Sequence, residues 1–303
     1  MTGVRERVNE GDMTLQVWVR ALRIRHWIKN FFVFIPFLLG PRFGWNPYLL
    51  KALLGVFLFC LMSSAVYLLN DILDLESDRL HPEKRERPLA AGQISVRAGI
   101  AIAGLLAAVA LIVGWFYNIG FFLVLVAYAA NNLMYSYYLK KKTVLDVMSI
   151  AFGFVVRVYG GGFIIDIEIT KWLVATVFAL SLFMGFGKRR SEQQDLKDEA
   201  VRVRKVHESY TVQKLDLLMG TSAAFTIVTY MLYSLAEETK AMHGTDNIIF
   251  TTPFVVYCIY RFMLKVQEEE HGDTVDVMLK DKGFLIAGSF WLMFLVYLVH
   301  YHK

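Results

Sequence analysis

Long runs of apolar residues, each closed by a short charged or polar segment, recur along almost all of the 303-residue chain. A bilayer-spanning helix needs about 20 mostly apolar residues. Nine stretches approach or reach that length, and we predict one transmembrane helix in each of them: 27–40, 49–72, 98–117, 120–139, 144–165, 171–187, 215–235, 248–265 and 283–300. The first is short and follows an amphipathic lead-in. No linker divides the chain, so we expect a single all-α domain over residues 1–303.

Composition supports a polytopic membrane protein. The chain is 56% apolar with a mean hydropathy of +0.45, which is too apolar for an ordinary soluble domain. Its net charge of +5 does not indicate nucleic-acid binding, because the basic residues lie in particular loops between the apolar stretches. Cys60 and Cys258 both lie inside apolar stretches and show no metal-binding spacing.

Basic residues are distributed unequally between the two ends of the predicted helices. The N-terminal segment and the loops after the second, fourth, sixth and eighth helices carry 25 of the 32 Lys and Arg residues. The opposite loops carry five, and Arg157 and Arg261 fall inside predicted helices. By the positive-inside rule, we expect an integral plasma (inner) membrane protein with a cytoplasmic N-terminus and an external C-terminus. Every loop with candidate chemistry is then cytoplasmic.

An acid cluster directly follows the second apolar stretch. If the helix continues through residue 78, Asn70, Asp74 and Asp78 fall within about 80° of one another, with Asp71 at about 100°. Carboxylates this close repel one another unless a cation lies between them. Mg²⁺ prefers oxygen ligands and commonly shares its shell with substrate phosphates. We therefore predict that these four side chains hold Mg²⁺ for a diphosphate; the alternative is a helix end whose acids pair with neighbouring bases.

A base cluster follows the acids at once. Mg²⁺ neutralises only part of a diphosphate, so the remaining phosphate oxygens need guanidinium or ammonium groups. The candidate phosphate-binding residues of this loop are Arg79, Lys84, Arg85 and Arg87.

Charged residues also lie near or within the apolar stretches. Asp146 and Arg157 are eleven residues apart, which returns them to within about 20° of one helical face. An arginine at membrane depth is by default a functional-site candidate, with a structural partner for a carbonyl or carboxylate as the alternative. Lys29, Tyr135 and Lys140 are further binding candidates; interfacial anchoring and helix–helix hydrogen bonding are their alternatives.

The sixth apolar stretch ends in the sequence GKRRSEQQDL. Lys188 and Glu192 share one helical face, and Arg189 lies off it. A stop-transfer signal would explain the bases but not the acids that follow, so Lys188, Arg189 and Glu192 are candidate site residues.

These motifs resemble the UbiA superfamily of intramembrane prenyltransferases. The superfamily's first aspartate-rich motif matches Asn70, Asp71, Asp74 and Asp78. The resemblance implies nine transmembrane helices around a cytoplasm-facing cavity, with loops 73–97 and 188–214 forming a cap over the site.

A narrower resemblance is to decaprenyl-phosphate phosphoribosyltransferases. It rests on NDILDLESDRLHPEKRERPLAAG, on the Trp27-x-Lys29-Asn30 segment and on GKRRSEQQDL. Ile24 departs from it, because the family usually has proline there. Aromatic prenyltransferases carry an Asp-x-x-x-Asp motif where this chain reads Lys-Arg-Arg-Ser-Glu. A basic segment suits a phosphorylated acceptor better than a second metal-bound prenyl diphosphate.

The resemblance implies Mg²⁺-dependent transfer of a 5-phosphoribosyl group from phosphoribosyl pyrophosphate to a polyprenyl phosphate in the membrane. Asp74 and Asp78 would hold the metal, and Lys188 and Arg189 would orient the acceptor, with Glu192 as an orienting group or a metal ligand. An aromatic or quinone-precursor prenyltransferase is the alternative activity, and a transporter of phosphorylated anions is a third. Assembly into a homo-oligomer is left open.

Overall fold

The computed structural model describes residues 10–44, 46–198, 210–268 and 280–301, with only the backbone described for residues 10–14 and 194–198. Helices make up almost all of these residues, and the described ranges contain no β-strand. The predicted all-α class is therefore confirmed.

Eight helices of the described chain are long and apolar enough to cross a membrane. They are α3 (Pro47–Leu73), α5 (Val96–Tyr117), α6 (Ile119–Tyr137), α7 (Leu145–Ile165), α8 (Lys171–Asp198), α9 (Val212–Leu235), α11 (Thr252–Glu268, after the 3₁₀ turn η5, Asn247–Thr251) and α13 (Lys282–His300). They match the second to ninth predicted stretches. Asn118 ends α5 and begins α6, where its side chain accepts a hydrogen bond from the backbone N–H of Phe121 at 3.1 Å.

The first predicted helix is not continuous, so the expected count of nine is not confirmed. After α1 (Glu10–Ala21), the chain forms a 3₁₀ segment, η1 (Ile24–Phe34), and then the short α2 (Ile35–Leu39). Pro36 lacks a backbone N–H and occupies the first turn of α2. Irregular backbone at membrane depth is tolerated where protein covers it, and η1 packs against α3 and α7.

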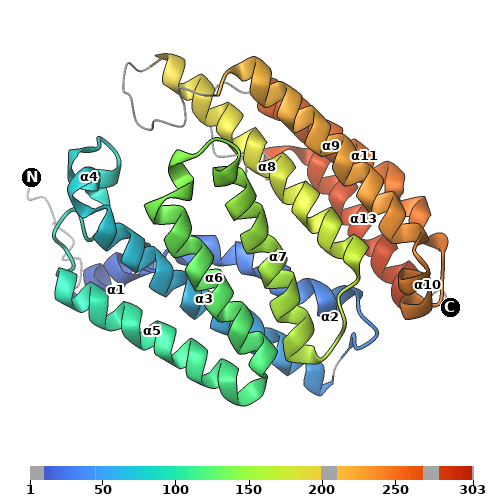
Figure 1. Ribbon diagram of the computed structural model, residues 1–303, viewed down its shortest axis with the longest axis horizontal. Coiled ribbons are helices and arrows are strands. Elements are labelled where there is room, and N and C mark those ends of the chain that lie inside the picture. The colour runs from blue at the N-terminus through green and yellow to red at the C-terminus, as the bar shows by residue number, and fades with distance from the viewer. Residues whose placement is uncertain (1–9, 45, 199–209, 269–279, 302–303) are drawn as a thin grey trace, which may run out of the picture.

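The long helices form two groups (Figure 1). The first contains α3, α5, α6 and α7, and Phe59, Phe121 and Tyr128 lie in its core. The second contains α8, α9, α11 and α13, and Phe183, Met219 and Phe262 lie in a core around α8, α9 and α11. Contact between α7 and α8 joins the groups.

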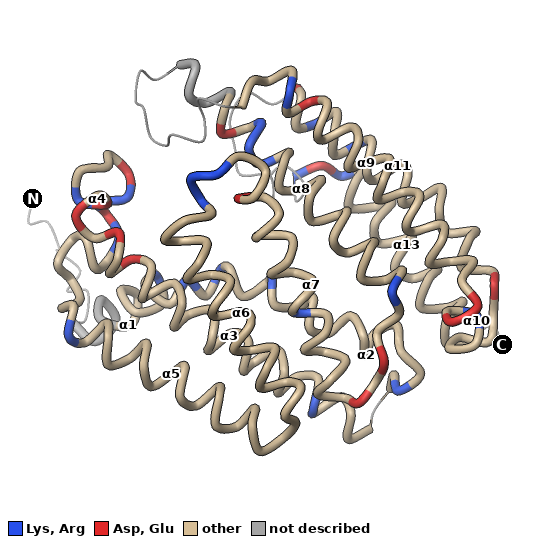
Figure 2. Tube along the Cα trace, viewed as in Figure 1, with Lys and Arg blue, Asp and Glu red and all other residues tan. Residues whose placement is uncertain are grey.

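Charged residues gather at the helix ends (Figure 2). One end brings together the C-terminal ends of α3, α6 and α8 with the N-terminal ends of α7 and α9; we call it the charged end. Here the chain continues from α3 into α4 (Leu75–Leu80), η2 (Lys84–Glu86) and, after α6, η3 (Leu139–Lys141). The connection α10 (Glu237–His243) lies at the opposite end.

The predicted helical path through residue 78 holds, with one local break. The backbone N–H of Asp74 donates to Asn70 at 2.9 Å, and that of Asp78 donates to Asp74 at 2.8 Å. Asp74 itself departs from helical geometry (φ −94°, ψ 8°), so α3 and α4 are separate helices that share one backbone hydrogen-bond pattern.

Candidate functional site

The four predicted metal ligands of the α3–α4 segment form two pairs. Asp71 and Asp78 are buried, and Arg87 lies between them. Its Nη1 is 2.7 Å from Asp78 Oδ2 and 3.2 Å from Asp71 Oδ1. Arg23, which comes from the turn before η1, also forms an ion pair with Asp71. Two buried carboxylates are thus balanced by guanidinium groups from distant segments.

Asn70 and Asp74 are turned instead toward α6. Ser136 Oγ donates to Asn70 Oδ1 at 2.7 Å. Lys140 Nζ donates to both carboxylate oxygens of Asp74 at 2.9 Å. The four side chains therefore present two adjacent pairs of oxygen donors, each turned toward the nearest hydrogen-bond donors.

The four side chains offer the type of ligand atom that Mg²⁺ prefers. All its ligating atoms are carboxylate or amide oxygens, which are the donors that a hard cation prefers. Within the described ranges, no three Asp, Glu, His or Cys side chains converge on one point. Mg²⁺ is typically held by one or two carboxylates, with water and substrate phosphate completing the shell. Asp78 pairs with Arg87, as the alternative of pairing with neighbouring bases predicts, and Asp74 pairs with Lys140, so a metal ion would compete with these bases for the carboxylates.

The basic loop after α4 divides into inward and outward residues. Arg87 points into the acid cluster, Lys84 is half-buried, and Arg79 and Arg85 are exposed. His81 Nδ1 accepts a hydrogen bond from the backbone N–H of Glu83 at 3.2 Å, which fixes the start of the loop. Partial burial and the nearby Lys84 ammonium lower the pKa of His81, so its ring is neutral and accepts this bond at neutral pH.

Near the C-terminal part of α8, Arg189 is the centre of a second cluster, where two carboxylates surround one guanidinium. Its Nε donates to Asp146 Oδ2 at 2.7 Å, and its Nη2 donates to the Tyr135 hydroxyl at 3.2 Å. It also forms an ion pair with Glu192. Arg189 is 4% exposed and Asp146 is fully buried, so both charges depend on this pairing. Lys188, the preceding residue, is half-buried.

The last turn of α6 connects the two clusters. Tyr135 contacts Arg189, and the next residue, Ser136, contacts Asn70. Lys140, just beyond α6, contacts Asp74. The predicted site residues of α3, α6 and α8 are thus brought together at the charged end.

Arg157 lies deeper, in a separate polar cluster. Its Nε donates to Asn30 Oδ1 at 2.8 Å, and its Nη2 donates to the Tyr128 hydroxyl at 3.1 Å. Asp146 and Arg157 do not pair, although both lie on α7; Asp146 turns to α8 and Arg157 turns to η1. Lys29 is half-buried beside Asn30.

Arg23, Ser136 and Tyr210 belong to the two charged clusters but are not among the site residues predicted from the sequence. Tyr210 donates to Asp146 Oδ1 at 2.9 Å across 64 positions of sequence. Helical periodicity relates only residues a few turns apart on one helix. Ser136 was within reach of that logic, since it lies four residues after Asn132 on the same helix, whereas Arg23 and Tyr210 were not.

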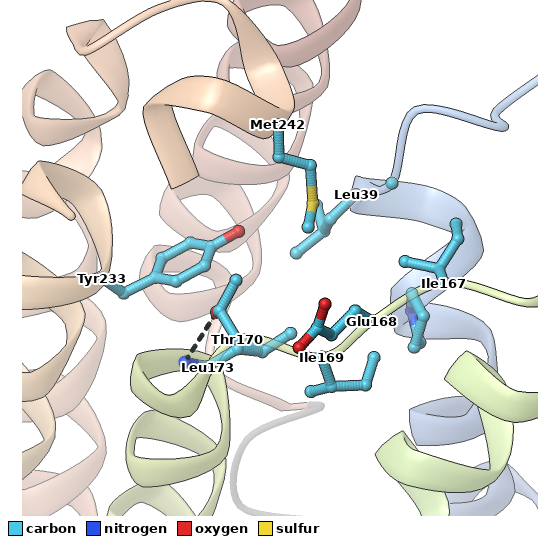
Figure 3. A pocket seen from close by; sticks show the side chains of 10 residues that line it. Leu39, Ile167, Glu168, Ile169, Thr170, Leu173, Tyr233 and Met242 are labelled. Carbon is cyan, nitrogen blue, oxygen red and sulfur yellow. Dashed lines mark hydrogen bonds between the residues drawn. The ribbon is translucent and has the colours of Figure 1, made fainter. Parts of the chain in front are cut away.

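A pocket lies at the opposite end of the bundle, between α2, the connection from α7 to α8, and the ends of α9 and α10 (Figure 3). Most of its lining is apolar, and its polar lining residues are Glu168, Thr170 and Tyr233. The pocket is separate from the two charged clusters. The cavity expected beside the charged end therefore stays a prediction.

The fold and the clusters define a class: all-helical integral membrane proteins that collect carboxylates and the arginines paired with them at one end of the bundle. Within that class the chain belongs to the UbiA prenyltransferase family, whose sequence profile matches residues 30–287.

Relatives of the chain cover nearly all of it. It is 31% identical to a decaprenyl-phosphate phosphoribosyltransferase of Mycolicibacterium smegmatis, over 90% of this chain and 89% of that protein. It is 30% identical to a protein of the same name from Corynebacterium glutamicum, over 93% of this chain and 86% of the relative.

Solved structures support the same fold. A UbiA homolog from Archaeoglobus fulgidus, bound to DMAPP and Mg²⁺, superposes with a TM-score of 0.70. The alignment covers 94% of this chain and 99% of that protein at 19% sequence identity.

Proposed function

We propose that the protein transfers a 5-phosphoribosyl group from phosphoribosyl pyrophosphate to a polyprenyl phosphate of the decaprenyl type and releases pyrophosphate. The observation that carries this proposal is Arg189, a buried arginine held beside the acid cluster through α6. The relatives named decaprenyl-phosphate phosphoribosyltransferase support it, at 30–31% identity over about nine tenths of the chain.

Mg²⁺ would be held by Asp74 and Asp78 with help from Asn70 and Asp71. The metal would neutralise charge on the diphosphate of the donor. The magnesium-bound structure of the Archaeoglobus homolog supports a divalent cation in this fold.

The basic residues of the loop would bind the remaining phosphate oxygens. Arg87 already lies among the acids, and it would contact the diphosphate as the bond from ribose C1 to the diphosphate oxygen breaks. The electron pair of that bond leaves with pyrophosphate. Contacts to the diphosphate or to the 5-phosphate are also proposed for Arg79, Lys84 and Arg85.

The acceptor phosphate would be oriented by Lys188 and Arg189. One of its oxygens forms the new bond to ribose C1, and it is an anion at neutral pH, so no strong general base is required. Glu192 would hold the Arg189 fork, and Tyr135 and Lys140 would line the same space. Lys29 and Arg157, which lie deeper in the helix bundle, would also help to orient the acceptor.

The reaction would take place on the cytoplasmic side of the plasma membrane, with the N-terminus on that side. The excess of Lys and Arg at the charged end supports this orientation. Residues 1–303 would act as one domain, with loops 73–97 and 188–214 covering the site.

Prenyl transfer to an aromatic acceptor is the competing activity, because the fold neighbour binds DMAPP. An enzyme with that activity is expected to have a second pair of aspartates at the end of the sixth apolar stretch. This chain has Lys188 and Glu192 at those positions.

The test uses the full chain purified in lipid nanodiscs with Mg²⁺, phosphoribosyl pyrophosphate and decaprenyl phosphate. The expected product is a lipid whose mass equals the acceptor plus one phosphoribosyl group, formed with one equivalent of pyrophosphate. Omitting Mg²⁺ or the lipid phosphate should abolish both products. Pyrophosphate release without a lipid product would contradict the proposal.

A further inference from the structure

We propose that Tyr210 is a positioning residue, which sets the orientation of Arg189 through Asp146. The inference rests on the proposed function, because it concerns how the acceptor phosphate is held. Tyr210 lies just before α9 and is outside every motif that the sequence singled out.

The Tyr210 hydroxyl makes two hydrogen bonds in a buried position. It donates to Asp146 Oδ1 at 2.9 Å and accepts from the backbone N–H of Val144 at 2.7 Å. Asp146 uses its other oxygen, Oδ2, for Arg189 Nε at 2.7 Å. With a donor on each oxygen, the carboxylate is fixed against rotation, and it fixes the plane of the guanidinium that it holds.

The backbone conformation of Val144 is a second observation that supports a positioning role for the Tyr210 hydroxyl. Its backbone is at φ 70° and ψ −45°, a region that β-branched residues rarely adopt. Such strain persists where surrounding contacts determine the backbone, and it clusters at functional sites. The side chain of Val144 cannot cap α7, whereas Tyr210 binds its N–H and thereby holds the start of the helix that carries Asp146.

The remaining contacts of Arg189 show what would be lost. Its Nη2 reaches Tyr135, one residue from the serine that binds Asn70. A small rotation of Asp146 would therefore move the arginine relative to the acid cluster. Burial raises the pKa of Tyr210, so the phenol keeps its proton and remains a donor at neutral pH.

A purely structural role is the competing explanation, because the Tyr210 ring packs with Leu215 and Met219. Tyr210→Phe keeps the ring and removes only the hydroxyl. The matched control is Tyr230→Phe. Tyr230 is also buried, and its hydroxyl bonds to Thr251 and Trp291 away from the charged end.

The experiment measures initial rates in nanodiscs while each substrate is varied separately. Tyr210→Phe should raise the KM for polyprenyl phosphate about tenfold and leave the KM for phosphoribosyl pyrophosphate within about twofold. Tyr230→Phe should change neither KM. On an Asp146→Asn background, Tyr210→Phe should add little further loss, because both variants act on one contact.

An unchanged acceptor KM in Tyr210→Phe would overturn the inference. So would effects of Tyr210→Phe and Asp146→Asn that multiply in the double variant. If the wild-type protein used prenyl diphosphate and an aromatic acceptor instead, the proposed function would fail. The role of Tyr210 would then be decided by the same double-variant comparison with those substrates.

Discussion

Two charge clusters meet at the end of α6, and they are built in opposite ways. In the α3–α4 cluster the helices supply the acids, and separate segments supply the cations that balance them. In the α8 cluster the helix supplies a buried arginine and one acid, Glu192, and a second acid, Asp146, comes from α7. The first arrangement gathers carboxylate oxygens, which are ligands for a cation, whereas the second holds one guanidinium fork in a fixed orientation between its partners.

The difference separates two activities that one fold can support. Two acid clusters suit two metal contacts on a prenyl diphosphate. An acid cluster beside a cluster centred on an arginine suits a metal-bound diphosphate donor beside a phosphorylated acceptor. Single substitutions can perturb each cluster separately, and their expected effects on activity differ in size.

Removing the carboxylate of Asp74 should have the largest effect. Asp74→Ala should lower kcat/KM by at least about 1,000-fold, because the Mg²⁺ that neutralises the donor diphosphate would lose a protein ligand. Product formation with labelled phosphoribosyl pyrophosphate measures it. Glu76→Gln, which changes an exposed acid of the same segment, is the control and should retain its rate. Full activity of Asp74→Ala would remove the metal assignment.

Replacing the guanidinium fork of Arg189 should have the second-largest effect on activity. Arg189→Lys should raise the KM for polyprenyl phosphate by about 50-fold, because a lysine cannot bind Asp146 and Tyr135 with the same geometry. Arg190→Lys is the matched control. Arg190 binds Asp216 at 2.6 Å and the Val266 carbonyl at 2.9 Å, so its loss should lower the thermal midpoint and spare the acceptor KM. A change confined to the donor KM of Arg189→Lys would contradict the division between clusters.

Lys140 tests whether the acid cluster selects a divalent cation. Its ammonium contacts both oxygens of Asp74, so it competes with a metal for this carboxylate. Lys140→Met should tighten Mn²⁺ binding about fivefold, as measured by electron paramagnetic resonance without substrate, while lowering turnover. Lys142→Met, an exposed lysine beside Tyr138, should leave the affinity unchanged. Weaker Mn²⁺ binding in Lys140→Met would show that the lysine supports the metal site.

The smallest effect should come from His81. Its pKa is lower in the folded protein than in the unfolded chain, so the folded state binds fewer protons. The order that His81 gives the loop is therefore present above pH about 6.5 and is lost as pH falls through its lowered pKa. The donor KM should rise over that range in the wild type and less steeply in His81→Asn. Identical profiles would show that this histidine does not control the loop.

The sequence predicted most of the fold, because apolar length is a direct physical requirement of a membrane helix. Eight helices appear where the apolar stretches placed them. The exception is the stretch 27–40, where buried Asn30 bonds to Arg157 and Pro36 interrupts the backbone pattern. Apolar length does not report such long-range polar contacts.

The candidate site was predictable where its residues lie on one helix. Spacing alone predicted that Asn70, Asp71, Asp74 and Asp78 lie near one another, and the structure places them in two adjacent pairs with different partners. Arg87 was expected as a neighbouring base, and it does pair with Asp71 and Asp78. Two other partners could not be found this way: Arg23 is 48 positions from Asp71, and Lys140 is 66 positions from Asp74. Those pairs depend on how helices pack, which local periodicity does not encode.

A competition assay in one membrane sample separates the two activities. Membranes containing the full chain would receive Mg²⁺ and both substrate pairs together: labelled phosphoribosyl pyrophosphate with polyprenyl phosphate, and a differently labelled prenyl diphosphate with an aromatic acid. We expect label from phosphoribosyl pyrophosphate in the polyprenyl lipid and no prenylated aromatic product. A prenylated aromatic product without labelled polyprenyl lipid would contradict it.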